Sequence, residues 1–184
     1  MEELVIYHHQ KDIPPLIYQQ ILDFLRIVWT DGFQEKNRLR DWVTNEKIHP
    51  VTFLLVEKGL LISCVQVVWK YLEHAGNTYK TYGLTGVFTY PQFRKQGYGI
   101  KLLNATREYI EKQDADIVMF NSDKTGFYEK AGYERMDKVV TLKGNPDKPE
   151  TDDGYAFMIF LSEKGRKGRI DFETKQVYFG EDTW

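Results

Sequence analysis

The stretch from Thr89 to Ile100 reads Thr-Tyr-Pro-Gln-Phe-Arg-Lys-Gln-Gly-Tyr-Gly-Ile, and it joins an apolar, strand-like run to an amphipathic, helix-like run. It contains the pattern Arg94-x-x-Gly97-x-Gly99. Because glycine has no Cβ, a ligand can approach the backbone closely at both glycines. The first amides of a helix lack an intrahelical acceptor, and the helix dipole favours negative charge there. The stretch therefore predicts a site for a phosphate or pyrophosphate group.

Three short apolar runs precede this loop and predict an antiparallel meander of strands. Turn signals at residues 58–59 and 75–77 separate the runs, which span residues 51–56, 60–71 and 78–89. Gly86 lies inside the third run, where an isolated glycine marks a bulge or a close approach of other groups.

The first 50 residues show one strand pattern and two helix patterns. We expect a strand at residues 4–7, a helix at 16–29 that begins after two prolines, and a second helix at 34–45. In the second helix, Leu39 and Trp42 are expected to face inward.

Downstream of the loop, helical and strand patterns alternate. The predicted elements are a helix at 97–112, a strand at 116–121, a short helix at 124–131, an extended segment at 133–140, a polar loop at 143–154 and a strand at 155–161. Asp123 can cap the short helix and Gly132 can end it. Residues 163–169 are interpreted as a charged turn, and the tail after them as short strands at 170–172 and 177–179. The order predicts one α/β (α+β) domain over residues 1–184, with a mixed, mostly antiparallel central sheet and helices on both faces.

Composition excludes several classes of protein. Of the 184 residues, 42% are hydrophobic and 15% are aromatic, which is typical of a folded core and not of a disordered chain. The net charge of −2 gives no support to nucleic-acid binding. No run is apolar enough to span a membrane and the N-terminus is not a secretory signal, so we expect a cytoplasmic protein.

Cysteine and histidine residues indicate neither a disulfide nor a metal site. Cys64 is the single cysteine, so no internal disulfide can form, and its place in a strand predicts a small core residue. The four histidines lack the spacing of metal ligands, so no metal is expected. They are His8, His9, His49 and His74.

A second motif follows the next predicted strand. Residues 121–133 read Asn-Ser-Asp-Lys-Thr-Gly-Phe-Tyr-Glu-Lys-Ala-Gly-Tyr, so that Tyr128 comes seven residues after Asn121. With this segment and Pro91-x-x-Arg94-x-x-Gly97-x-Gly99, the chain resembles the GCN5-related N-acetyltransferase (GNAT) superfamily over roughly residues 80–137. Both motif spacings and the intervening helix agree. The resemblance implies an acetyl-coenzyme A dependent N-acetyltransferase, with a splay between the fourth and fifth strands of its sheet.

The resemblance also implies where acetyl-coenzyme A binds. The amides of the loop would hold the pyrophosphate, with positive charge from the side chains of Arg94 and Lys95. The pantetheine arm would pair like an additional strand with the backbone of the third meander strand, beside Gly86. The thioester would lie between Thr89 and Asn121. The implied cofactor residues are Val87, Phe88, Thr89, Arg94, Lys95, Gln96, Gly97, Tyr98, Gly99, Ile100 and Asn121.

Acetyl transfer needs a neutral amine to attack the thioester and an acid to protonate the leaving thiolate. In the family that acid is the tyrosine matching Tyr128, and no covalent enzyme intermediate is required. Family members often place a glutamate on the strand before the loop as a base. This sequence has Thr85 about where that glutamate is expected, and no carboxylate elsewhere on the strand. The base therefore stays unassigned.

The acceptor is expected to be a primary amine of a small molecule. The acidic stretch 149–154 and the terminal Asp182-Thr-Trp184 resemble aminoglycoside 2′-N-acetyltransferases, which implies that the tail 163–184 packs near the substrate. Carried over by position, the substrate residues are Thr85, Asp152, Asp153, Asp182 and Trp184. Acidic groups suit a polycationic amine by charge complementarity. The family also forms homodimers, although no residue here indicates one.

Each feature has a simpler structural interpretation as well. The glycine loop can be a plain strand-to-helix turn, Tyr128 and Trp184 can be packing residues, and Asp152 and Asp153 can be solvated loop charges. Two other functions stay open. A non-catalytic acyl-coenzyme A binding module would explain the missing strand carboxylate. A peptide or protein N-acetyltransferase would need an open groove for its substrate.

Overall fold

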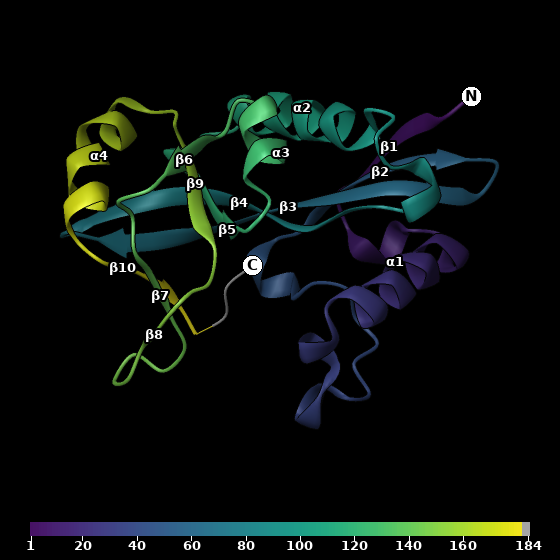
Figure 1. Ribbon diagram of the computed structural model, residues 1–184, viewed down its shortest axis with the longest axis horizontal. Coiled ribbons are helices and arrows are strands. Elements are labelled where there is room, and N and C mark those ends of the chain that lie inside the picture. Colours follow the sequence, from purple (N-terminus) through teal and green to yellow (C-terminus); the bar gives the residue numbers. More distant parts are fainter. Residues whose placement is uncertain (182–184) are drawn as a thin grey trace. The chain divides into compact units, whose positions relative to one another are not determined.

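The computed structural model describes residues 1–181, which form two compact units. The first comprises residues 1–67 and 85–103, and the second comprises residues 68–84 and the chain from 104 onward. Hydrogen-bonded strands follow the order β1-β2-β3-β4-β5-β9-β6 in one sheet and β10-β7-β8 in another (Figure 1). The pairs β4–β5 and β10–β7 are parallel, whereas β1–β2, β2–β3, β5–β9, β6–β9 and β7–β8 are antiparallel. The predicted mixed, mostly antiparallel sheet is confirmed, and the single domain stays a prediction.

The first unit packs one amphipathic helix against strands. Ile17, Ile21 and Leu25 recur at helical spacing in α1 and are buried. They share a core cluster with Leu54 and Cys64. Burying each such side chain stabilises the fold by about 1.5–3 kcal/mol. The elements that lie in or enter this unit are β1 (Glu3–Tyr7), α1 (Pro15–Val28), β2 (Val51–Glu57), β3 (Leu60–His74), β4 (Asn77–Thr89) and α2 (Tyr98–Glu111).

The helix predicted at residues 34–45 is wrong. Two short 3-10 turns, Thr30–Phe33 and Glu35–Asn37, lead instead into an irregular segment. Leu39 is 84% exposed and Trp42 is 41% exposed, so neither faces a core. The physical reason is Arg40, whose guanidinium donates hydrogen bonds to the carbonyls of this segment and lies 3.8 Å from the Trp42 ring centroid. These side-chain bonds replace a helical backbone ladder.

The second unit builds an aromatic core around β5. The ring centroid of Phe120 lies 4.8 Å from that of Tyr128 and 5.6 Å from that of Phe157. The parallel register between β4 and β5 comprises Thr81–Ile117 and Tyr82–Val118, and so short a register is consistent with the predicted splay. The further elements are β5 (Ile117–Ser122), α3 (Thr125–Lys130), β6 (Glu134–Met136), β7 (Thr141–Lys143), β8 (Glu150–Thr151), β9 (Tyr155–Phe160), α4 (Glu163–Thr174) and β10 (Val177–Gly180).

Two local predictions in this unit are wrong. Lys124, and not Asp123, is the N-cap of α3, which has no side-chain cap. The polar loop predicted at 143–154 includes the end of β7 and all of β8. Gly132 does end α3 as predicted, with φ at +80°.

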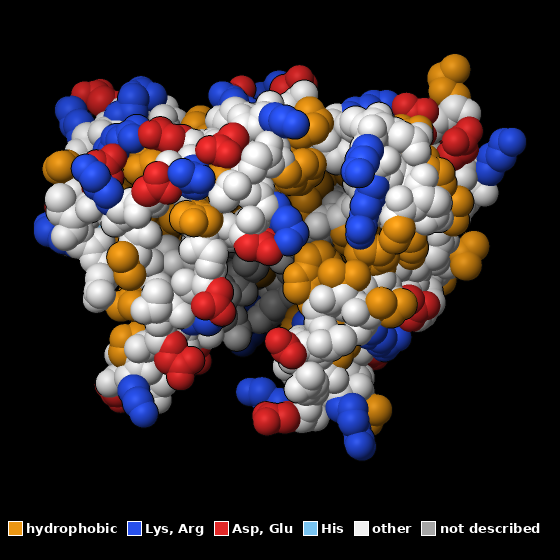
Figure 2. All heavy atoms as spheres, in the orientation of Figure 1, with side chains coloured by type: hydrophobic (Ala, Val, Ile, Leu, Met, Phe, Trp, Pro, Cys, Tyr) orange, Lys and Arg blue, Asp and Glu red, His pale blue; other side chains and the backbone are white. Residues whose placement is uncertain are grey.

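Residues 163–174 form helix α4, where the sequence predicts a turn and a strand. Ser162 caps this helix by accepting a hydrogen bond from the Gly165 amide at 2.9 Å. Ion pairs one turn apart support it, and Figure 2 shows basic and acidic side chains interspersed over α4. The glycines that indicate a turn serve packing instead. A Cβ on Gly165 would lie 2.3 Å from the Asp116 carbonyl oxygen, and one on Gly168 would lie 2.2 Å from the Tyr79 hydroxyl.

Asp116 connects β4, β5 and α4. Its carboxylate accepts hydrogen bonds from the Lys80 amide at 2.9 Å and the Ser162 hydroxyl at 2.6 Å. Lys164 adds an ion pair at 2.6 Å. Burial raises the pKa of this carboxyl, but the bonds from Lys164, Ser162 and the Lys80 amide outweigh burial and hold the pKa below its usual value. Asp116 therefore stays ionised and fixes where β5 begins.

We expect Gly168→Ala to destabilise the protein, because the new methyl group would overlap the buried Tyr79 ring. Overpacking of this kind costs about 1–3 kcal/mol. Gly126→Ala in α3 is the matched control, since its Cβ meets no atom within 4 Å. Alanine favours a helix over glycine by about 1 kcal/mol, so this control is expected to be neutral or stabilising. Urea unfolding of the two variants measures the difference. Equal free energies of unfolding would contradict close packing of α4 on Tyr79.

Candidate functional site

The anion-binding half of the predicted site lies in the first unit. Lys95 and Gly97 adopt positive φ angles of 62° and 87°. The first helical bond of α2 runs from the Lys101 amide to the Gly97 carbonyl at 2.9 Å. The amides of Tyr98, Gly99 and Ile100 precede that bond, so they have no acceptor within the helix. The loop therefore has the donors that a phosphate group requires.

The polar side chains of the loop are exposed, and two of them donate to nearby carbonyls. Arg94, Lys95 and Gln96 are exposed. Arg94 Nε donates to the Thr89 carbonyl at 3.0 Å, and Gln96 Nε2 donates to the Gln92 carbonyl at 3.1 Å. Arg94 thus ties the loop to the end of β4, in addition to the positive charge that the sequence predicts for it.

The strand residues predicted to hold the pantetheine arm already have several partners. Phe88 is buried and its ring stacks on Phe24 with centroids 4.1 Å apart, so only its backbone could contact a ligand. The Phe88 carbonyl accepts from the Ser63 hydroxyl at 2.8 Å, and the Thr89 hydroxyl lies 2.8 Å from the same group. Thr85 and Val87 are half-buried.

Gly86 adopts φ +57° inside β4, a conformation typical of glycine at a bulge. A Cβ at this position would lie 3.2 Å from Oε1 of Gln66. Gln66 is fully buried, and its amide donates to the Thr52 hydroxyl at 2.9 Å. A buried polar side chain therefore approaches the strand at Gly86, which is the close approach that the strand glycine indicates, although the sequence does not say which residue makes it.

The acid candidate lies in the second unit. Tyr128 is 6% exposed, and its ring packs against both Phe120 and Phe157, with centroids 4.8 Å and 5.2 Å away. Burial raises the pKa of Tyr128 to about 12, although a hydrogen bond with the Ser122 side chain acts in the opposite direction. The phenol is therefore protonated at neutral pH and can donate a proton. Ser122 is a neighbour of the acid that sequence reasoning missed.

Asn121, the penultimate residue of β5, contacts a residue that the sequence analysis did not single out. Its Nδ2 donates a hydrogen bond to the hydroxyl of Thr141 in β7. Thr141 is 4% exposed. The two residues are twenty positions apart and separated by α3 and β6, so no local motif in the sequence indicates their contact.

The predicted substrate residues in the acidic loop differ in whether their side chains already have a partner. Asp152 forms an ion pair with Lys143 at 2.5 Å, and the same oxygen accepts the Asp153 amide at 3.0 Å. Its charge is therefore neutralised locally. Asp153 is exposed. Asp182 and Trp184 lie outside the described residues.

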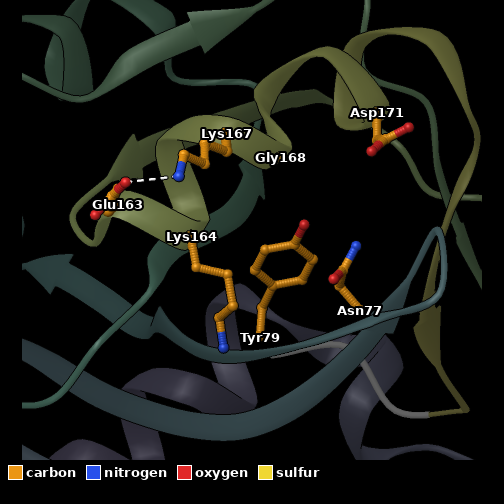
Figure 3. A pocket seen from close by; sticks show the side chains of 7 residues that line it. All are labelled: Asn77, Tyr79, Glu163, Lys164, Lys167, Gly168 and Asp171. Atoms are coloured by element: carbon orange, nitrogen blue, oxygen red, sulfur yellow. Dashed lines mark ion pairs between the residues drawn. The ribbon is translucent and has the colours of Figure 1, made fainter.

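One pocket of about 410 Å³ lies in the second unit, between α4 and the start of β4 (Figure 3). In Figure 3 the Tyr79 hydroxyl points toward α4. Charged side chains that line the pocket form ion pairs: Lys167 pairs with Glu163 at 2.6 Å, and Asp171 pairs with Lys175 at 2.7 Å. None of the residues predicted for catalysis or coenzyme binding lines this pocket, which is formed by Asn77, Tyr79, Glu163, Lys164, Lys167, Gly168 and Asp171.

Neither a metal-binding cluster nor a membrane-spanning helix is found among residues 1–181. Across residues 1–181, no three His, Cys, Asp or Glu side chains converge as a metal site would require. In the same part of the chain, no helix has the length and apolar character needed to cross a bilayer.

Solved structures with the same fold are numerous. A probable N-acyltransferase from Enterococcus faecalis V583 is 17% identical, with a TM-score of 0.57, over 74% of this chain and 33% of that one. ElaA from Escherichia coli is 13% identical, with a TM-score of 0.56, over 86% of this chain and 97% of that one. An aminoglycoside 6′-acetyltransferase type Ii is 15% identical, with a TM-score of 0.56, over 86% and 97%. The chain thus spans about a third of the first of these structures and nearly all of the other two.

Sequence comparison identifies the family. No curated protein matches this chain. The model of the acetyltransferase (GNAT) domain matches residues 16–136, which include both the glycine loop and the segment from Asn121 to Tyr133. The match covers more than half of the chain and agrees with the fold, the helix-start amides without an intrahelical acceptor and the buried tyrosine. The chain therefore belongs to the GNAT family of acetyltransferase domains.

Proposed function

We propose that this protein transfers the acetyl group of acetyl-coenzyme A to a primary amine of a small molecule. The observation that carries the proposal is the geometry of residues 94–100. Positive φ angles at Lys95 and Gly97 and the start of α2 leave successive amides for the pyrophosphate. Membership of the GNAT family supports acyl transfer as the reaction.

The chemistry is a direct displacement. The amine nitrogen attacks the thioester carbonyl carbon, the new C–N bond forms and the C–S bond breaks. Tyr128 protonates the departing thiolate, because its raised pKa keeps the phenol neutral until that step. The proton lost by the amine goes to water or to a carboxylate that we leave unassigned, since β4 contains none.

The acceptor follows less directly from the residues. Acidic side chains in the loop before β9 favour a cationic amine, but Asp152 is already paired with Lys143. We therefore propose a small amine with one or two charges, with an aminoglycoside as a further candidate. The location in the cytoplasm, the homodimer and the packing of the tail near the substrate stay predictions.

Release of coenzyme A thiol across an amine panel identifies the acceptor. We expect release with at least one polyamine, aminoglycoside or simple aliphatic amine, and none with unstructured peptides. Release with peptides alone would replace the small-molecule acceptor by a protein N-terminus or lysine. Binding of acetyl-coenzyme A without release anywhere in a broad panel would contradict the proposed transfer.

Binding of acetyl-coenzyme A is expected to depend on Gly97. Alanine at this positive φ adds strain of about 1–2 kcal/mol and disturbs the loop amides. Gly59→Ala is the matched control, because Gly59 also has positive φ (+77°) and open space around its Cβ, but lies in the β2–β3 turn. Isothermal titration should show weaker binding for Gly97→Ala and wild-type binding for Gly59→Ala. No binding to the wild type at millimolar ligand would reject the proposed cofactor.

Replacement of Tyr128 by phenylalanine should remove the acid and keep the ring packing. We expect kcat to fall by about 10²-fold or more, with little change in the Kd for acetyl-coenzyme A. Tyr133→Phe is the control, since Tyr133 is equally buried and its pKa is also raised to about 12. Because a neutral phenol persists until the pH approaches 12, Tyr128 should cause no loss of kcat up to about pH 10. Equal kcat values for Tyr128→Phe and wild type would exclude this role.

A further inference from the structure

Thr141 meets Asn121 through its side chain. The hydroxyl of Thr141 accepts a hydrogen bond from Nδ2 of Asn121, at the end of β5. Thr141 is 4% exposed, so its hydroxyl is shielded from water. Leaving a buried hydroxyl without a hydrogen-bond partner costs free energy. The bond therefore holds the Thr141 and Asn121 side chains in one relative orientation.

The backbone around Thr141 is held on several sides. The Thr141 carbonyl accepts from the Asp152 amide at 2.9 Å, and β7 pairs with β10 at Val177. Gly154 also approaches the end of β5, where a Cβ would lie 2.8 Å from the Ser122 carbonyl carbon. The three-stranded sheet β10-β7-β8 therefore braces the end of β5 next to Asn121.

The bond to Thr141 fixes the orientation of the Asn121 side-chain amide. An asparagine amide rotates over a broad, roughly two-fold χ2 range unless a partner fixes it. With Nδ2 bound to Thr141, Oδ1 occupies the other branch of the amide and can accept a hydrogen bond. The pantetheine arm of coenzyme A contains amide N–H groups, which are donors of the matching kind.

We propose that Thr141 is a positioning residue for coenzyme A binding, which holds the Asn121 amide with its oxygen directed to the ligand. The inference rests on the proposed function, since it takes Asn121 as a coenzyme A contact. Thr141 itself touches no ligand in this arrangement. Its effect on the reaction passes through Asn121.

Three variants test the proposal. Thr141→Val keeps the shape and removes the hydroxyl, whereas Thr141→Ser keeps the hydroxyl and removes a methyl group. Thr81→Val is the matched control, because Thr81 is also fully buried and its hydroxyl bonds the Tyr79 carbonyl in its own strand. Each folded variant is assayed for its Kd and KM for acetyl-coenzyme A, and for kcat at saturating cofactor.

We expect Thr141→Val to raise the Kd and KM for acetyl-coenzyme A by about three- to tenfold, the effect of one lost hydrogen bond, with kcat within about twofold. Thr141→Ser should restore wild-type values and Thr81→Val should leave them unchanged. Unchanged KM in Thr141→Val, the same defect in Thr141→Ser, or the same defect in Thr81→Val would each overturn the positioning role.

A measurement without ligand separates this inference from the proposed function. The side-chain amide signals of Asn121 in a ¹H–¹⁵N spectrum, assigned by their loss in Asn121→Asp, should shift in Thr141→Val and not in Thr81→Val. Absence of that shift would overturn the Thr141–Asn121 bond itself. A second outcome compares the wild type with and without acetyl-coenzyme A. If the Asn121 signals shift in Thr141→Val but do not shift when acetyl-coenzyme A is added to the wild type, both the cofactor role of Asn121 and the inference are rejected.

Discussion

The carboxylate of Asp116 is the interaction on which the second unit depends. Only two residue pairs join β5 to β4 in the described register, whereas six join β5 to β9, so backbone pairing holds β5 to β4 more weakly than to β9. Asp116 adds bonds from Lys80 in β4 and from Ser162 and Lys164 at the start of α4. Hydrogen bonds to a charged group are each worth about 1.5–3 kcal/mol. The attachment of β5 to β4 and α4 therefore depends largely on this single half-buried charge, and Asn121 and Ser122 lie in the same strand.

The proposed reaction requires two things of the protein: it must position the amine beside the thioester, and it must supply one proton to the leaving thiolate. Tyr128 is held neutral by the aromatic residues around it, because a phenolate would lose its hydration there. The same burial that stabilises the core therefore prepares the acid. In the proposed reaction, with Thr85 in place of a strand carboxylate, the amine arrives neutral or loses its proton to water or to a carboxylate outside β4. An acceptor amine with a low pKa would suit such a site better than one with a high pKa.

Local patterns predicted the parts of this fold that have local causes. The meander, α1, α2 and β5 follow from apolar spacing and turn residues, and both motifs lie where those elements meet. The segment at 34–45 was mispredicted because Arg40 satisfies its carbonyls through a side chain. The sequence does not predict helix α4, because a glycine required for close packing cannot be told from a glycine in a turn by sequence alone. Gly165 and Gly168 allow close packing of the helix on Asp116 and Tyr79. The Asn121–Thr141 bond joins separate strands, and nothing in either sequence neighbourhood encodes it.

Cys64 has a practical consequence for assays of the proposed acetyl transfer. It is the single cysteine of the chain, it is fully buried under α1, and burial raises the pKa of its thiol. The thiolate is the form that reacts with disulfide reagents. The folded protein is therefore expected not to react with such reagents. The colour that develops in an assay with them then comes from the thiol of free coenzyme A. Reaction of Cys64 itself would report that the core beneath α1 has opened.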